Sequence, residues 1–438
     1  MNKKLLTYLL IVSLILVVFG TSALAKETLR FWHTFTQPVR IDYMKEVARD
    51  FEKEYDVNVE IEVVPWGQVE QKWVAAKAAG TLPDVIVGTP NDAMAVWLAG
   101  ASNPLNDVFE ELGGNKFFTP GVIDKFSNYK GNIISLPLYA HTRLFLYRAD
   151  IFKELGLEPP ETWDELLEVT AKANNPPTRY GALQFWSLAD RGATLYLYTL
   201  LRTNGASFFD KDFNVNFNTP EFIETVKFLV DWYKVGAPQG ELNLGFHEQW
   251  FNSFTTGLNT MGIDTMFMAY SIKTDNPELY KKGALGVCMP PVNDGKERAY
   301  FADAPSLIDT KGPNEKLSKE FIKYMYELNR YVGFLLTIPG GQYPVTIAAS
   351  NSERFWSDPL IKENEEGVKM TLEAIANGTL EGMTYGVNPF APLVDKGVIE
   401  RMMQNIVGKD MPVEEAVAQA QAELEKDVKE LRERLENQ

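Results

Sequence analysis

Apolar and polar positions along the first part of the chain repeat with two different periods. Residues 57–64 alternate one by one, as a half-buried strand does, whereas Val47, Phe51 and Tyr55 lie four positions apart, as on one face of a helix. The same two patterns predict strands at 29–32 and 83–87 and helices at 43–55, at 68–79 and from Asp92 onward. This alternation is typical of an α/β domain whose mostly parallel sheet has helices on both faces.

Ligands of such sheets bind beyond the carboxyl ends of the strands. The loops that follow the predicted strands, residues 32–37, 65–68 and 88–92, are therefore the first candidates for a binding site. They combine aromatic side chains with hydrogen-bonding groups and contain no Arg or Lys. Because a phosphate calls for convergent cationic groups, these loops favour an uncharged ligand.

A second region begins in the stretch 134–166. The unbroken apolar run 144–147 predicts a buried strand, and Gly156 ends the helix that follows it. Thr162 and Glu165 have the spacing of a capping box, which marks the start of another helix. Further helices are predicted at 222–233 and 413–435.

The N-terminal residues have the pattern of a removable signal peptide. Lys3 and Lys4 precede an apolar stretch at 5–19, and small residues at 23–25 form a cleavage site. We expect export to the periplasm with cleavage near Ala25. Lipidation is not expected, because the residue directly after that site is Lys26 and not a cysteine.

Without Lys3 and Lys4 the chain carries 41 Lys and Arg against 59 Asp and Glu, a net charge of −18. Such a surface repels nucleic acid and anionic lipid, so neither is an expected partner. The single cysteine, Cys288, cannot form an internal disulfide, and its apolar neighbours predict an inert core thiol.

Motifs for cofactors, metals and catalysis are absent or incomplete. Asp210, Asp212, Asn214 and Glu221 imitate a calcium loop, but Val215 stands where the sharp turn needs Gly, so a hairpin is the better interpretation. The three histidines have no metal-binding spacing, and neither a phosphate loop nor a hydrolase nucleophile elbow occurs. We therefore expect no cofactor, no metal and no catalytic residues.

Four segments, taken together and in order, resemble the family-1 extracellular solute-binding proteins of ABC importers. In chain order they are AAGTLPDVIV at 78–87, LPLYAHTRLFLYRADIFKELGLEPPETWDEL at 136–166, FTTGLNTMGID at 254–264 and GKDMPVEEAVAQAQ at 408–421. The resemblance implies a periplasmic binding protein-like II fold of class α/β, in which two lobes are joined by hinge strands with a ligand cleft between them. It also implies transient docking on membrane-embedded ABC permease subunits, and we expect the protein to act as a monomer.

By the family pattern, residues 1–25 are the signal peptide, 26–139 plus 304–345 form the N-terminal lobe, and 140–303 plus 346–438 form the C-terminal lobe. The first hinge strand would be 139–147, with further crossings near 300–305 and 344–346. The sequence departs from the family pattern at two positions that would contact a ligand. The glycine pair usual in the second crossing is replaced at 302–304, and Phe267 stands where Trp is expected.

Sugars are held by aromatic faces and by polar groups that bind hydroxyl pairs. The aromatic candidates are Trp32, Trp66, Tyr139, Trp186, Trp250, Phe267 and Tyr343, each of which could instead be a core residue. Polar candidates at positions that match ligand-facing stretches of the family are His33, Gln37, Gln68, Asn91, Asp92, His141, Asp264 and Asn388. Asp92 could equally cap the following helix, and His141 could be a satisfied buried histidine.

These observations predict a periplasmic receptor that captures a mono- or oligosaccharide by lobe closure and delivers it to an ABC permease. A receptor of the same fold for a polyol or glycerol phosphate is the first alternative. An exported glycoside hydrolase is a further alternative, because 59 acidic residues neither reveal nor exclude a catalytic carboxylate pair.

Overall fold

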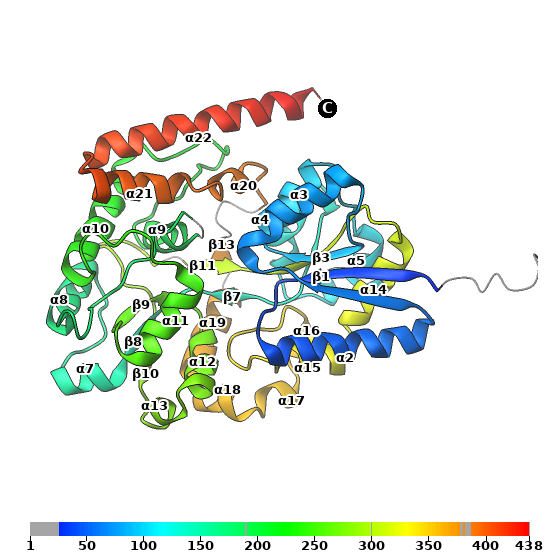
Figure 1. Cartoon of the computed structure of the whole chain (residues 1–438), viewed down its shortest axis with the longest axis horizontal. Helices are drawn as coiled ribbons and strands as arrows, with labels where there is room; N and C mark the ends of the chain where they lie inside the picture. Colours follow the sequence, from blue (N-terminus) through cyan, green and yellow to red (C-terminus); the bar gives the residue numbers. More distant parts are fainter. Residues whose placement is uncertain (1–25, 189–190, 299, 377–379, 382–386, 438) are drawn as a thin grey trace, which may run out of the picture.

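The computed structural model describes residues 26–188, 191–298, 300–376, 380–381 and 387–437. Two α/β lobes lie side by side, and a small sheet connects them (Figure 1). The fold class expected from the sequence is thereby confirmed. The exact division of the chain between the lobes, at 139, 303 and 345, stays a prediction.

The N-terminal lobe is built on a five-stranded sheet of order β2-β1-β3-β12-β6. Its strands are β1 (Thr28–His33), β2 (Asn58–Val63), β3 (Val85–Gly88), β6 (Leu136–Pro137) and β12 (Ser306–Asp309). β1 is parallel to β2 and β3, whereas β12 is antiparallel to β3 and β6. A strand from the second half of the sequence therefore lies inside the N-terminal sheet.

Helices cover both faces of this sheet, which explains why every residue of the short β3 run Val-Ile-Val-Gly is buried. They are α2 (Pro38–Tyr55), α3 (Val69–Ala79), α4 (Pro90–Leu98), α5 (Asn106–Leu112), α6 (Val122–Phe126), α14 (Glu315–Met325) and α15 (Leu328–Leu335). Along β1, Leu29, Phe31 and His33 point to one buried face, and Phe31 packs against Phe321 of α14. The carboxyl ends of β1, β2 and β3 point toward the second lobe (Figure 1).

The C-terminal lobe has an antiparallel sheet of order β10-β8-β9. Its strands are β8 (Leu144–Arg148), β9 (Met261–Asp264) and β10 (Leu285–Cys288). The helices around it are α7 (Ala149–Leu155), α8 (Trp163–Ala173), α9 (Gly192–Arg202), α10 (Pro220–Gly236), α11 (Phe246–Thr256), α12 (Phe267–Asp275), α13 (Pro277–Lys281), α21 (Val398–Lys409) and α22 (Val413–Glu436). The run 144–147 is the central strand, as its apolar character predicts.

Two antiparallel stretches cross between the lobes. Pro137 pairs with Ser306 in the large sheet, and His141 pairs with Asp303 in the small sheet of β7 (His141–Thr142), β11 (Tyr300–Asp303) and β13 (Leu380–Glu381). The residues between these pairs are 138–140 on one side and only 304–305 on the other. The Pro305 carbonyl faces the backbone N–H groups of both Leu138, at 2.7 Å, and Tyr139, at 3.5 Å. The crossing is therefore a β-bulge, which bends the longer side.

The arrangement of the sheets corrects one detail of the sequence interpretation. Residues 139–147 do not form one hinge strand, because β7 and β8 belong to different sheets. A third segment lies against the bulge, where Ala140 and Tyr343 exchange backbone hydrogen bonds of 3.0 Å in both directions.

Local signals predicted several boundaries well. Gly80 and Gly156 end α3 and α7 in the left-handed conformation, and Thr162 and Glu165 form the capping box of α8. α2 begins at Pro38, five residues before the predicted start. The calcium-like segment is a hairpin, in which Asp210 accepts hydrogen bonds from the backbone of Asp212 and Asn214 at 2.9 and 2.8 Å.

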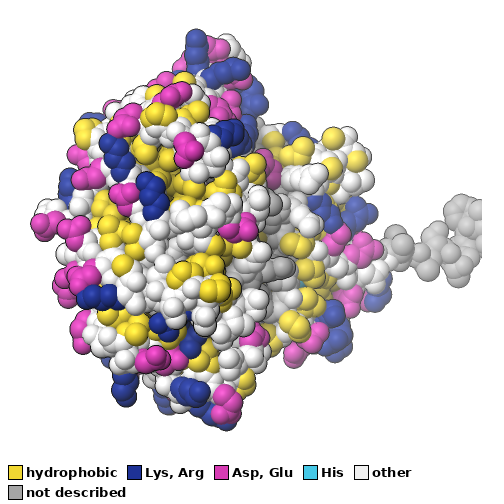
Figure 2. Space-filling model, turned by 60° about the vertical axis from the view of Figure 1, so that its left-hand side comes forward, with side chains coloured by type: hydrophobic (Ala, Val, Ile, Leu, Met, Phe, Trp, Pro, Cys, Tyr) yellow, Lys and Arg dark blue, Asp and Glu magenta, His cyan; other side chains and the backbone are white. Residues whose placement is uncertain are grey.

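Short elements complete the described chain. They are η1 (Trp66–Gln68), η2 (Gly114–Lys116), β4 (Asn128–Tyr129), β5 (Asn132–Ile133), α16 (Ile347–Ser350), α17 (Glu353–Trp356), α18 (Pro359–Glu363), α19 (Glu365–Ala376) and α20 (Ala391–Val394). Within the described ranges, no helix is both long and apolar enough to cross a bilayer. One face of the molecule shows acidic and basic side chains interspersed (Figure 2).

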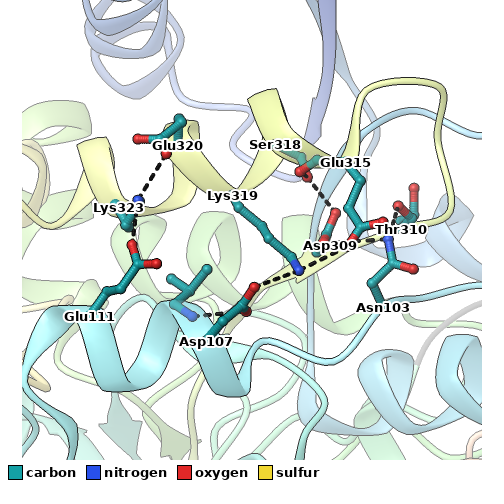
Figure 3. Close-up of polar contacts among 11 residues, drawn as sticks. Asn103, Asp107, Glu111, Asp309, Thr310, Glu315, Ser318, Lys319, Glu320 and Lys323 are labelled. Atoms are coloured by element: carbon teal, nitrogen blue, oxygen red, sulfur yellow. Dashed lines mark hydrogen bonds and ion pairs between the residues drawn. The ribbon is translucent and has the colours of Figure 1, made fainter.

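Ion pairs join α14 to α5 on the N-terminal lobe (Figure 3). Lys319 lies 2.8 Å from Asp107, and Lys323 lies 2.6 Å from Glu111. Asp309, at the end of β12, is fully buried beneath them and accepts a hydrogen bond from Ser318. Burial raises the pKa of the Asp309 carboxyl to about 7, although the Ser318 hydroxyl and the positive charge of Lys319 oppose the rise.

Candidate functional site

The loop after β1 folds back on the start of α2. The backbone N–H of Phe35 donates to Nδ1 of His33 at 3.2 Å, and the two rings stack with centroids 5.1 Å apart. Arg40, in the first turn of α2, lies over the Phe35 ring at 3.9 Å. Burial, helped by the positive charge of Arg40, lowers the pKa of His33 to about 4, so this histidine is neutral near pH 7.

Side chains of the crossing strands continue this cluster toward the C-terminal lobe. The ring of Tyr139 lies 5.4 Å from the Arg40 guanidinium and 5.8 Å from the His141 ring. Nε2 of His141 is 3.8 Å from a carboxylate oxygen of Asp303, across the pair of β7 and β11. Burial alone would raise the pKa of Asp303, but His141 and the positive charges of Arg191 and Arg143 hold it below its usual range.

A buried ion pair lies on the sheet of the C-terminal lobe. Arg143, which precedes β8, donates to Asp264 at the end of β9, and both side chains are almost fully buried. Burial raises the pKa of Asp264, and the positive charge of Arg143 opposes the rise. Removing either partner would leave a buried charge uncompensated.

Hydrogen bonds around Asp395 join the two lobes directly. Asp395, which follows α20, accepts a hydrogen bond from Nδ2 of Asn91 in α4 at 2.9 Å and one from Nη1 of Arg191 at 2.8 Å. The pKa of Arg191 is raised: burial would lower it, but the carboxylates of Asp395, Asp92 and Asp303 more than compensate. Arg191 therefore joins groups from both lobes and from the crossing strands.

Asp92 caps its own helix. Its carboxylate accepts hydrogen bonds of 2.8 Å from the backbone N–H and the hydroxyl of Thr89, which completes a capping box. Burial raises the pKa of Asp92, and the positive charge of Arg191 opposes the rise. The capping alternative for this residue is thus confirmed, whereas contact between Asp92 and a ligand stays a prediction.

Hydrogen bonds, ring contacts and interactions between charges link several of the predicted residues into one network, and other predicted residues lie outside it. The connected ones are His33, Gln37, Tyr139, His141, Asp264, Asn91 and Asp92. Trp32, Trp66 and Gln68 lie at or beside the carboxyl ends of β1 and β2, apart from this network; Trp32 and Trp66 are partly exposed and Gln68 is exposed. Phe267 is partly exposed at the start of α12 and packs against Phe251.

Four other candidates are buried. Trp186 is 1% exposed and lies against Tyr233, and Trp250 is fully buried beside Phe254. Neither indole presents a free face in this conformation, so the alternative of a core role fits both better than stacking on a ligand. Tyr343 is fully buried at the third crossing, and the side-chain oxygen of Asn388 accepts a hydrogen bond from the backbone of Phe390 at 2.8 Å.

The network also contains residues that the sequence interpretation did not select as ligand-binding: Arg40, Arg143, Arg191, Asp303 and Asp395. Arg143 had a visible signal, because it is a charge at the edge of an apolar strand. Asp303 was noted only as part of the departure from the family pattern at 302–304. Arg40 and Asp395 lie in unremarkable helical surroundings, and only the fold brings them to the lobe boundary.

The network offers carboxylates, amides and guanidinium groups, and partly exposed aromatic rings lie outside it at the carboxyl ends of β1 and β2 and at the start of α12. Such a set can bind hydroxyl groups through paired donors and acceptors while a ring face covers the apolar side of a sugar or polyol. Among the described residues, no group of three or more His, Cys, Asp or Glu is placed to hold a metal ion.

Comparison with known proteins points to the same kind of molecule. A profile of the bacterial extracellular solute-binding protein family matches residues 37–327. Over 280 residues the chain is 29% identical to a putative binding protein of Brucella abortus, a match that covers 61% of this chain and 64% of that protein. Over 239 residues it is 28% identical to the sn-glycerol-3-phosphate-binding periplasmic protein of Salmonella typhimurium, covering 50% and 52% of the two. Both matches span less than two thirds of the relatives' length.

Among solved structures, a solute-binding protein of an ABC transporter from Thermotoga lettingae, bound with α-D-tagatose, is similar with a TM-score of 0.79. The similarity covers 91% of this chain and 99% of that protein at 22% sequence identity. At this identity the comparison establishes only that the fold is shared. The bound α-D-tagatose is a finding about that protein and not about this chain.

Proposed function

The chain belongs to the bacterial extracellular solute-binding protein family, and we propose that it captures a carbohydrate or related polyol between its lobes for delivery to an ABC importer. The observation that carries this proposal is the position of Asp395. Its carboxylate bonds to Asn91 of one lobe and to Arg191 of the other, at the boundary that a captured ligand has to share. A molecule bound there contacts both lobes and stabilises the closed form.

The partly exposed aromatic residues supply apolar faces on both sides of this boundary. Trp66 lies just after β2 in the N-terminal lobe, and Phe267 and Tyr270 lie on α12 of the C-terminal lobe. Gln37, Gln68 and Asn91 supply uncharged hydrogen-bonding groups from the N-terminal loops. This combination suits a polyhydroxylated ligand better than a flat apolar one.

We further infer that the protein acts in the periplasm as a monomer, after removal of residues 1–25, and docks transiently on permease subunits. The family consists of binding proteins. We infer that this protein likewise binds its ligand without converting it. Rigid lobes joined by a bent crossing allow closure with dihedral changes confined to a few residues.

A thermal-shift screen followed by calorimetry tests the proposal. The probes are monosaccharides, oligosaccharides from two to four units, polyols such as mannitol and ribitol, and inositol. At least one should raise the melting temperature in a concentration-dependent way, because a ligand that binds only the folded state stabilises it. Small-angle scattering at the same ligand concentration should show the populations of open and closed forms shifting toward the closed form. Stabilisation by none of these probes, or only by unrelated amino acids or peptides, would contradict the proposal.

A further inference from the structure

Arg40 is a buried cation at the boundary between the lobes. Its side chain is in the first turn of α2 and the residue is only 3% exposed. Burial lowers its pKa from the usual value, yet a guanidinium keeps its proton in proteins. A charge placed in such surroundings needs compensation, since moving an ion out of water is costly unless the ion is paired.

The partners of Arg40 are all neutral. Nη1 donates to the side-chain oxygen of Gln37 at 3.3 Å, and Nη2 donates to that of Gln342. The guanidinium lies over the Phe35 ring and 5.4 Å from the centre of the Tyr139 ring, and Tyr139 is also a hydrogen-bonding partner of its side chain. Within the described ranges, Arg40 forms no ion pair with a carboxylate, and its Nε–H has no acceptor. The positive charge is thus solvated by amides and rings but not balanced.

Three further features increase the positive potential beside Arg40. α2 has no acidic residue in its first turn, and the side chain of its N-cap residue, Gln37, makes no capping hydrogen bond. Because Nδ1 of the neutral His33 accepts the Phe35 N–H, its proton is on Nε2, which is buried and has no acceptor. The hydroxyl of Thr34 is also buried without a partner. A helix start with unused donors and no acid favours a negative group.

The C-terminal lobe reaches this place. Tyr270 of α12 is among the groups that act on the charge of Arg40. The loop that carries Gln342 packs on the same helix, because a Cβ added at Gly341 would lie 3.1 Å from Cα of Phe267. Lobe opening would therefore uncover the surroundings of Arg40, and lobe closure would enclose whatever had bound beside it.

We propose that Arg40 is an anion-binding residue, and that the ligand is a polyhydroxylated molecule with a carboxylate or phosphate group. The inference rests on the proposed function and narrows its substrate class to sugar acids and sugar or polyol phosphates. The anion uses the free Nε–H together with Nη2, which form one edge of the guanidinium, and displaces the Gln342 oxygen from that edge, while Gln37 keeps Nη1 in position. This proposal replaces the expectation of an uncharged ligand. That expectation followed from the lack of Arg and Lys in the loops 32–37, 65–68 and 88–92, whereas Arg40 lies just beyond the first loop, in α2.

Matched pairs of ligands test the inference with the wild-type protein. Calorimetry compares galactose with galacturonate, mannitol with mannonate, and glycerol with sn-glycerol 3-phosphate, with inorganic phosphate alone as a further probe. At least one acid should bind about 10–100-fold more tightly than its neutral parent, the range expected for charge-assisted hydrogen bonds. The carboxylate and phosphate arms distinguish the two kinds of anion.

Two variants locate the effect. Arg40→Gln should abolish the preference for the acid, whereas Arg49→Gln, the same change at an exposed position of α2, should keep it. If Arg40→Gln does not fold, Arg40→Lys is the second variant. It retains the positive charge, and we expect it to retain part of the preference for the acid.

Equal or tighter binding of the neutral parents would overturn this inference and leave the proposed function standing. A preference for the acid that survives in folded Arg40→Gln would also overturn it. Absence of binding in both arms would overturn this inference, whereas the proposed function is overturned only if the wider thermal-shift screen of oligosaccharides and polyols also finds no ligand.

Discussion

The carboxylate of Asp395 accepts a hydrogen bond from the side-chain amide of Asn91 at 2.9 Å, although the two residues are 304 positions apart in sequence. The bond joins α4 of the N-terminal lobe to the segment after α20, and the two helices themselves are in contact. A direct bond between the lobes contributes to the free energy of closure before any ligand contributes. Its removal is therefore the most specific way to shift the balance between open and closed forms.

Asn91→Ala should weaken ligand binding without unfolding the protein. The loss of one net hydrogen bond is worth about 0.5–1.5 kcal/mol, so the dissociation constant should rise about 2–10-fold. In small-angle scattering the ligand-free variant should be more extended than the wild type. Unchanged affinity and an unchanged scattering curve would show that the bond does not contribute to closure.

The matched control is Asn128→Ala. This residue also donates its side-chain amide to a carboxylate, that of Asp124 at 3.1 Å, but within one lobe. It should leave both the scattering curve and the affinity as in the wild type.

Trp66→Ala should weaken the binding of a carbohydrate or polyol by about 1–3 kcal/mol, because it removes a partly exposed ring face beside β2. Trp97→Ala removes another half-buried indole at the far end of α4 and should leave affinity unchanged. Calorimetry gives the affinities and thermal unfolding gives the stabilities. A large fall in melting temperature at full affinity would make Trp66 a structural residue instead.

Asp309 predicts a pH dependence of stability. Its pKa is about 7 in the folded protein and about 4 when unfolded, so the folded state holds more protons between these values. Stability should therefore fall as pH rises from about 4 to about 7, by an amount on the order of 2–4 kcal/mol from this group. Denaturant unfolding of Asp309→Asn across this range should show a flatter curve than the wild type.

Other groups titrate in the same range, so the informative quantity is the difference between variant and wild type. The lowered pKa of His33, about 4, gives the opposite slope, because stability is lost as pH falls through this window. Asp107→Asn, in the same cluster as Asp309, is the control. Burial would raise the pKa of Asp107, but the hydrogen bond and ion pair with Lys319 hold it below its usual range, so its removal should lower stability at neutral pH, and this loss should shrink as the pH falls through the lowered pKa.

Any carbohydrate that binds should be returned intact. Prolonged incubation of the purified protein with a binding oligosaccharide, followed by chromatography, should recover the starting material. Release of shorter sugars in amounts exceeding the protein would instead support the glycoside hydrolase alternative.

The sequence predicted those parts of the fold that depend on neighbouring residues. Gly80 and Gly156 end their helices because a left-handed residue is needed there, and the Thr162 capping box is complete within four residues. The position of the second crossing came from family resemblance, and the pairing of Asp303 with His141 agrees with it.

Relations between distant residues were not predictable in the same way. Trp186 is buried against Tyr233 of α10, and Trp250 lies against Phe185, contacts between separate segments that a local pattern does not encode. Arg40 looks like any polar residue in the first turn of a helix, and its burial arises from Phe35, Tyr139 and Gln342, which three separate segments bring together. The bulge likewise depends on the register between two strands and not on the composition of either.

The place of β12 in the N-terminal sheet also determines the order in which the protein can fold. This strand lies between β3 and β6, yet it is synthesised only after most of the C-terminal lobe. Until residues 306–309 are available, β3 has an unpaired edge and β6 has no partner in the sheet. Pairing over such a sequence separation is slow because a long loop has to close first. The N-terminal sheet should therefore stay incomplete until the chain has been made beyond Asp309, which favours passage across a membrane before folding is complete.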